Sequence, residues 1–243
     1  MANLQEKSGK NISSPLLVFS PHLDDAVFSC GELMARCPGA SVATVFAAAP
    51  SGFPSLTGWD KACGFKSAQE AVFCRREEDL RALAVLKARP SWMDFCDDQY
   101  QASPSFAELS HAVDEILRIH ATYAVLLPAG LFHADHLRLH DALLSLHARY
   151  SERTWIMYED ALYRRIPGLL QRRLATLHSA GFCATPLSMP QDMDARELKR
   201  QAVCCYASQV RALDKAANGH ADACAPEGYW LLETGLASEG GAR

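Results

Sequence analysis

The sequence predicts a single α/β domain, Rossmann-like in arrangement, in which a mostly parallel sheet is flanked by helices and the active site lies at the C-terminal strand ends. Short apolar runs alternate with longer amphipathic segments along most of the chain. This repeated strand-helix order is typical of right-handed parallel crossovers. At 243 residues and 49% hydrophobic content, the chain can also bury a large core. We expect the domain at 15–236, an irregular segment at 1–14 and a frayed tail at 237–243.

The expected strands are short apolar runs that end at prolines, glycines or acidic residues. The first, Leu16–Phe19, is followed directly by Ser20 and Pro21. The others are expected at 41–47, 92–96, 123–127 and 155–158.

The expected helices lie between these strands and have apolar residues at helical spacing. They are predicted at 25–36, 67–87, 106–120 and 136–150, and the chain after Gly168 is expected to be mostly helical, with helices at 169–179 and 194–213. Residues 50–64 contain several prolines and glycines, which predict a long loop. Loops of this length in compact domains are often functional, so this loop is a candidate lid or substrate wall.

Composition excludes several classes of protein. The net charge of −4 and the scattered Lys and Arg residues provide no basic stripe, so we expect no nucleic-acid partner. Nine cysteines form no CxxC pair, which predicts reduced thiols in a cytoplasmic protein. We expect the adjacent Cys204 and Cys205 to be two small buried residues. No secretory signal is found at the start, and no apolar run reaches the roughly 18 residues of a membrane span.

Two polar clusters each follow an expected strand. The first is Ser20-Pro21-His22-Leu23-Asp24-Asp25, and the second is His133-Ala134-Asp135-His136. The first could be only a turn in which an Asp caps the next helix. However, parallel strands have their C-terminal ends at one edge of the sheet, so the two clusters can converge. Histidine and carboxylate side chains there can bind a metal, and one of two adjacent aspartates can remain free to accept a proton.

The motifs together resemble the LmbE-like, or PIG-L, family of metal-dependent N-acetylglucosamine deacetylases. The resemblance covers most of the chain. It rests on both His-Asp clusters and on Ser29-Cys30-Gly31, the spacing of Arg75, Glu78, Ala82 and Leu86, Tyr158-Glu159-Asp160, and Tyr206-x-Ser208-Gln209.

This resemblance implies a role for each residue of the clusters. The metal would be Zn²⁺, held by His22, Asp25 and His136. Fe²⁺ is the alternative, because a ligand set of two histidines and one carboxylate suits both metals. Asp24 would be the general base that deprotonates the metal-bound water, and a protonated His133 would stabilise the oxyanion.

Further residues are expected around this set. Asp135 would orient a histidine. Arg75, Asp97 and the aromatic Trp59 are the candidate substrate contacts. The implied substrate is an N-acetylated amino sugar, either a small molecule or part of a glycoconjugate. The protein could also form a homo-oligomer. The alternatives are the same amide hydrolysis on an N-acyl secondary metabolite or thiol conjugate, and a non-catalytic sugar-binding protein.

The sequence departs from the family pattern at three positions. Leu23 stands where proline is most frequent, and Ala26 where a glutamate often follows the two aspartates. Leu131 stands where some members have a tyrosine near the substrate carbonyl, and Tyr158 or Tyr206 could replace that tyrosine. His140 and His147 are expected to be packed or surface residues. The remaining histidines, His111, His120, His178 and His220, lack ligand spacing.

Overall fold

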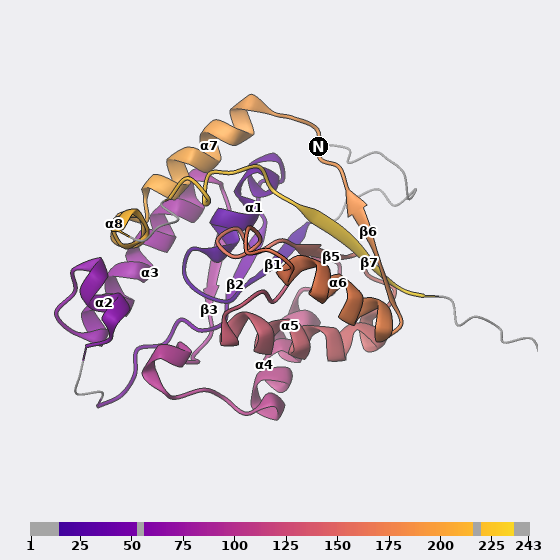
Figure 1. The fold of residues 1–243 in the computed structure, drawn as a ribbon, viewed down its shortest axis with the longest axis horizontal. Helices are drawn as coiled ribbons and strands as arrows, with labels where there is room; N and C mark the ends of the chain where they lie inside the picture. Colours follow the sequence, from indigo (N-terminus) through magenta and orange to yellow (C-terminus); the bar gives the residue numbers. More distant parts are fainter. Residues whose placement is uncertain (1–14, 53–55, 216–219, 236–243) are drawn as a thin grey trace, which may run out of the picture.

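The computed structural model describes residues 15–52, 56–215 and 220–235, and Figure 1 shows their fold. The segments predicted at 1–14 and 237–243 lie outside the described residues.

The strands of the described residues form one sheet of seven strands in the order β3-β2-β1-β4-β5-β7-β6. Strands β3, β2, β1, β4 and β5 run parallel, whereas β7 is antiparallel to both of its neighbours. The strand bounds are β1 Leu16–Ser20, β2 Ser41–Thr44, β3 Arg89–Trp92, β4 Ala124–Pro128, β5 Trp155–Tyr158, β6 Phe182–Leu187 and β7 Tyr229–Thr234. The predicted mostly parallel sheet is confirmed.

Helices cover both faces of the sheet (Figure 1). Leu16 and Val18 of β1 pack into one apolar core with α1, α3, α7 and α8, while Leu17 and Phe19 pack into a second core with α4, α5 and α6. This alternation is the period of two that a strand buried on both faces requires. The helix bounds are α1 Asp25–Arg36, α2 Gly58–Cys63, α3 Ala68–Val85, α4 Phe106–Ile119, α5 Ala134–Leu146, α6 Leu169–Ser179, α7 Met193–Cys204 and α8 Ala207–Lys215, with short 3₁₀ turns η1 Asp98–Tyr100 and η2 His147–Tyr150.

The strand order places a topological switch between β1 and β4. From β1 the chain continues outward through β2 and β3, and it then returns to β4 on the other side of β1. In open α/β sheets, ligands bind outside the carboxyl ends of the strands at such a switch. The two His-Asp clusters follow β1 and β4, so both lie at this position.

Three sequence predictions about the elements are wrong. Strand β3 lies at Arg89–Trp92 rather than 92–96; it is the edge strand, where Pro90 is tolerated because one side needs no ladder bond. The loop predicted at 50–64 contains helix α2, which is capped where the Thr57 side chain accepts a hydrogen bond from the Asp60 N–H. The region after Gly168 also holds the strands β6 and β7, so it is not mostly helical.

The helix predicted at 194–213 is divided into α7 and α8. The break follows from Glu78 of α3, whose carboxylate accepts hydrogen bonds from both the N–H and the hydroxyl of Ser208, at 2.8 and 2.6 Å. These bonds begin a new helix beside α3. Cys204 at the end of α7 is exposed and Cys205 is half-buried, so the prediction of two buried cysteines is also wrong.

Candidate active site

The turn from β1 into α1 carries the first cluster, and the segment from β4 into α5 carries the second. Two residues that are not glycine have a positive φ angle here: Asp24 in the first cluster, with φ 156°, and Phe132 directly before the second, with φ 62°. Such conformations are uncommon for residues with a Cβ and often mark functional sites.

His22, Asp25 and His136, the predicted metal ligands, lie together. One ligand atom from each lies within 4.8 Å of the other two. The Asp25 Oδ2 atom is 3.2 Å from Nδ1 of His22 and 3.1 Å from Nε2 of His136. The His22 N–H also donates to Asp25 Oδ2 at 2.9 Å, which fixes the carboxylate at the start of α1.

A second carboxylate holds each of these two imidazoles in place. Asp135 Oδ2 lies 3.0 Å from Nε2 of His22, and Asp160 Oδ1 lies 3.0 Å from Nδ1 of His136. If both nitrogens donate to these carboxylates, His22 Nδ1 and His136 Nε2 remain as the metal-facing atoms. Sequence reasoning anticipated Asp135 in this role but missed Asp160. The available signal was the acidic end of strand β5.

The donor set fits a divalent cation. Nε2 of His136 is buried and makes no hydrogen bond among the described residues, although Asp25 is close to it. Burial alone would lower the pKa of His136, but Asp25 and Asp160 outweigh it and raise this pKa to about 10. The pKa of His22 is raised for the same reason, by Asp97, Asp135 and Asp25 against burial. The carboxylates therefore favour positive charge on the imidazoles, and a metal ion can take the place of the protons.

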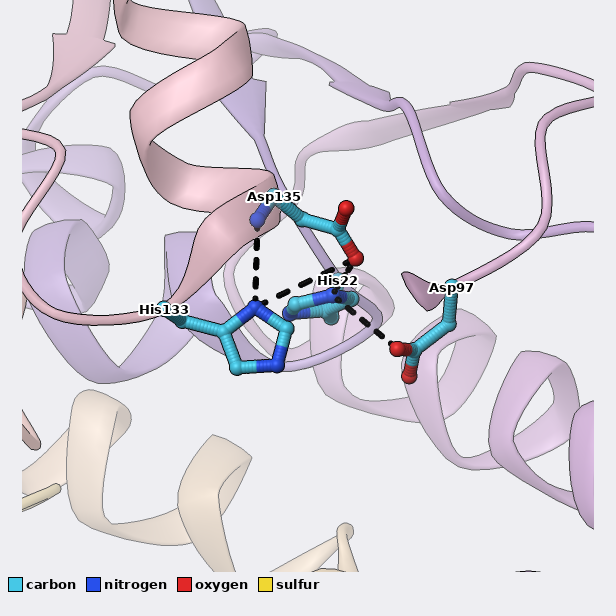
Figure 2. A group of neighbouring side chains, drawn as sticks. All are labelled: His22, Asp97, His133 and Asp135. Atoms are coloured by element: carbon cyan, nitrogen blue, oxygen red, sulfur yellow. Dashed lines mark hydrogen bonds and ion pairs between the residues drawn. The ribbon is translucent and has the colours of Figure 1, made fainter. Parts of the chain in front are cut away.

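Another set of donors is less suited to a metal. His22, Asp97, His133 and Asp135 also offer atoms within 4.8 Å of one another (Figure 2). However, the carboxylate of Asp135 already accepts hydrogen bonds from Arg138 at 2.9 Å and from the N–H of Asp98 at 2.8 Å. The first group therefore has the more available ligand atoms of the two.

Asp24 lies beside the ligand group without a capping role. It occupies the N-cap position of α1, but its side chain makes no capping hydrogen bond, which argues against the turn-and-cap alternative. Burial, followed by the charge of Asp25, raises its pKa well above the ordinary value. Asp24 is only 8% exposed and lines a cavity at this edge of the sheet.

His133 lies beside His22 (Figure 2), and the centroids of the two rings are 4.9 Å apart. Its Nδ1 accepts a hydrogen bond from the N–H of Asp135 at 3.3 Å, so a neutral imidazole carries its proton on Nε2. Burial lowers the pKa of His133, as do the nearby His22 and His136. This direction opposes the protonated state that we expected. A neutral ring still provides an N–H donor.

A cavity of about 360 Å³ opens onto these residues. The three candidate substrate contacts, Arg75, Asp97 and Trp59, all line it. Arg75 is buried and donates to Asp60 at 2.7 Å, whereas Trp59 is 37% exposed and donates to Gln209 at 2.9 Å. Beside His22, His133 and the two aspartates, the lining also includes Leu23, Phe46, Ala48, Val72, Gln99, Tyr100, Leu162, Tyr163, Gln209 and Leu213.

The tyrosines considered as replacements at the oxyanion lie elsewhere. The Tyr158 hydroxyl donates to the carbonyl of Phe19 at 2.7 Å, and the Tyr206 hydroxyl donates to Asp79 at 2.7 Å. Tyr163, which sequence reasoning missed, lines the cavity, and its ring centroid lies 5.2 Å from that of His136. Tyr163 belongs to none of the sequence motifs described above, so no signal in the sequence indicated it.

The other histidines of α5 and η2 are not ligands of this group. His140 is buried, and its Nδ1 lies 2.8 Å from the carbonyl of Pro128. His147 packs against Trp155 and Phe182, with ring centroids 5.1 Å apart in both pairs. Both are packed residues, as expected.

Comparison with known proteins identifies the family. Residues 17–147 match the model described as PIG-L, GlcNAc-PI de-N-acetylase. The chain belongs to the PIG-L family. As a PIG-L protein it is a hydrolytic N-deacetylase, which confirms the predicted enzyme class. No curated protein matches the chain significantly.

Several solved PIG-L-like structures resemble the chain. A triple mutant of a deacetylase from the teicoplanin biosynthetic pathway has 26% sequence identity and a TM-score of 0.76, with 93% of this chain and 100% of that chain covered. The A40926 pseudoaglycone deacetylase has 26% identity and a TM-score of 0.71, with coverage of 93% and 99%. The N,N'-diacetylchitobiose deacetylase from Pyrococcus horikoshii shares the fold, at 18% identity, a TM-score of 0.51 and coverage of 81% and 70%.

Within the part of the chain that the structure describes, no helix has the length and apolar character needed to cross a bilayer.

Proposed function

We propose that this PIG-L protein hydrolyses the acetamide of an N-acetylated amino sugar carried by a small molecule or glycoconjugate, and releases acetate and a free amine. The main support is that His22, Asp25 and His136 share one ligand group and that Asp24 lies beside it on the same cavity. The similar structures at 26% identity are deacetylases of the teicoplanin pathway and of the A40926 pseudoaglycone, which agrees with deacetylation of a larger conjugate.

His22 Nδ1, Asp25 and His136 Nε2 would hold the metal, which we propose is Zn²⁺, with Fe²⁺ as the alternative for such a ligand set. When bound, a divalent ion supplies Lewis acidity that lowers the pKa of water and polarises a carbonyl. Asp135 and Asp160 would keep the two imidazoles oriented and in the correct tautomer.

The reaction itself requires one base and at least one hydrogen-bond donor. Asp24 accepts a proton from the attacking water, whose oxygen forms a bond to the amide carbon. The C–N bond then breaks, and Asp24 returns the proton to the leaving nitrogen. Because the raised pKa of Asp24 makes protonation easier than for an exposed aspartate, one side chain can perform both transfers.

The negative charge that develops on the carbonyl oxygen needs donors facing the cavity. His133 provides an Nε2–H, since its Nδ1 is already an acceptor. Tyr163 also lines this cavity, and its hydroxyl would be a second donor; burial raises the pKa of this phenol, so it keeps its proton.

The test is to measure acetate and free amine released from N-acetylglucosamine derivatives, including N,N'-diacetylchitobiose and an N-acetylglucosaminyl glycopeptide. We expect equal amounts of the two products, loss of both with a chelator and recovery with Zn²⁺. A protein that binds these sugars but releases no acetate with Zn²⁺ or Fe²⁺ supports the non-catalytic alternative. Release from N-acyl thiol conjugates alone supports the other alternative.

A further inference from the structure

A chain of hydrogen bonds joins the start of helix α2 to Asp97 at the cavity. The Thr57 hydroxyl donates to Oε1 of Gln99 at 2.7 Å, and Nε2 of Gln99 donates to Oδ2 of Asp97 at 2.6 Å. The N–H of Gln99 also donates to Oδ1 of Asp97 at 3.0 Å. Gln99 therefore holds both oxygens of the Asp97 carboxylate.

The orientation of the Gln99 amide follows from its two neighbours. A carboxylate can only accept hydrogen bonds, so the amide presents its NH₂ group to Asp97 and its oxygen to Thr57. Thr57 matches this orientation, because it is the N-cap of α2 and its oxygen already accepts from the N–H of Asp60 at 3.0 Å. The hydroxyl hydrogen of Thr57 is therefore available for Gln99.

Asp97 has acceptor capacity left for a ligand. An ionised carboxylate has about four acceptor positions, and Gln99 uses one on each oxygen. Nε2 of His22 lies 3.8 Å from Oδ1 of Asp97, which is too long for a hydrogen bond (Figure 2). The Asp97 side chain is 18% exposed and lines the cavity, so the remaining positions can accept hydrogen bonds from a sugar.

We propose that Gln99 and Thr57 are positioning residues that set the sugar specificity of the site, because they hold the Asp97 carboxylate in the orientation that accepts a hydrogen bond from a sugar hydroxyl. This inference rests on the proposed deacetylation of an amino sugar. A carboxylate that is already held in place loses little conformational freedom when the sugar binds, so more of the hydrogen-bond energy contributes to affinity.

The first experiment measures whether the wild-type protein recognises a hydroxyl. The Zn²⁺-loaded protein is assayed for acetate release from the N-acetylglucosamine derivative that it hydrolyses fastest, and from deoxy versions that each lack one free hydroxyl of the amino sugar. We expect kcat/KM to be about 10- to 100-fold lower for at least one deoxy version, the range for loss of a hydrogen bond to a charged group. Equal kcat/KM values for all versions overturn the inference and leave the proposed deacetylation intact. Absence of acetate from every derivative contradicts the proposed function itself.

The second experiment measures the same discrimination in variants of the two positioning residues. Gln99→Met removes the amide, so Oδ2 of Asp97 loses its partner and the discrimination should decrease to less than threefold. Thr57→Val should decrease it as well, whereas Thr57→Ser retains the hydroxyl and should keep it. The discrimination is a ratio of two kcat/KM values measured on one protein, so partial loss of folded protein cancels. If Gln99→Met is unfolded, Thr57→Val serves as the second variant. Undiminished discrimination in the folded variant overturns the inference.

Ser103→Ala is the matched control. Ser103 follows the same 3₁₀ turn, η1, and its hydroxyl donates to the Asp98 carboxylate at 2.7 Å, but neither residue lines the cavity. This variant should keep the discrimination of the wild type. Equal losses in Ser103→Ala and Gln99→Met would show a general disturbance of η1 and overturn the role of Gln99.

Discussion

Asp160 accepts a hydrogen bond from His136 Nδ1 at 3.0 Å, and each of the two side chains is 1% exposed. Asp160 also accepts from the N–H of Leu131 at 2.6 Å, so it connects the end of β5 to the segment that carries the second cluster. We predict that Asp160→Asn lowers Zn²⁺ affinity 10- to 100-fold, because His136 loses the partner that orients it. Competition with a chromophoric chelator measures this.

Glu159→Gln is the control for that variant. Glu159 is the adjacent residue, but it accepts from Trp230 at 3.0 Å and does not contact a predicted ligand. The Zn²⁺ affinity of the Glu159→Gln variant should equal that of the wild type. Equal losses in both variants would show that the effect is a general disturbance of the end of β5.

Asp24 and Asp25 are adjacent, but their substitutions should differ in effect. Asp24→Asn should lower kcat by 10²- to 10⁴-fold and retain the metal, because it removes only the proton acceptor. Asp25→Asn should lose the metal as well. Metal analysis of each purified variant, together with kcat, tests this. Metal loss from Asp24→Asn would contradict the assignment of the base.

Tyr163 and Tyr158 provide a second contrast. Tyr163→Phe should lower kcat at least tenfold with little change in stability, since loss of one oxyanion donor typically costs 10²- to 10³-fold and His133 remains as a second donor. Tyr158→Phe should instead lower the free energy of unfolding by about 1 kcal/mol, because its hydroxyl donates to the carbonyl of Phe19 in the core. Both kcat and urea unfolding are measured for each variant. A normal kcat in Tyr163→Phe would exclude this hydroxyl from the reaction.

The parallel part of the fold follows from local sequence patterns. The strands β1, β4 and β5 are continuous apolar runs buried on both faces, and such runs are distinctive. The edge strands β3 and β6 are half-exposed and each contains a proline, Pro90 and Pro186, so their sequences lack this pattern. The break between α7 and α8 depends on Glu78, which is distant in the sequence, and no local pattern in 194–213 indicates it.

The ligand group was predictable for a different reason. His22, Asp25 and His136 follow strands whose carboxyl ends must meet, so spacing and topology together bring them to one edge. The cavity positions of Tyr163, Val72 and Leu213 were not predictable, because apolar and aromatic residues at helical spacing have the same pattern whether they face a core or a cavity. The protonation state of His133 also depends on neighbours that only the three-dimensional structure reveals.

Asp79 of α3 should make stability depend on pH. It is 2% exposed and accepts from Trp92 at 2.8 Å and from Tyr206 at 2.7 Å. Burial outweighs these two bonds and raises its pKa from 3.8 to about 6. Because the folded protein holds this proton more tightly than the unfolded chain, Asp79 contributes stability that is complete below about pH 4 and is lost as the pH rises through about 6.

Asp79→Asn should remove this dependence. The two pKa values differ by about two units, so the free energy of unfolding of Asp79→Asn relative to wild type should increase by about 2 kcal/mol between pH 4 and pH 7.5. Urea unfolding of both metal-free proteins across this range measures the difference, and groups common to both proteins cancel. A difference that is constant with pH, or that decreases as the pH rises, would show that the folded protein holds Asp79 as a carboxylate, stabilised by Trp92 and Tyr206.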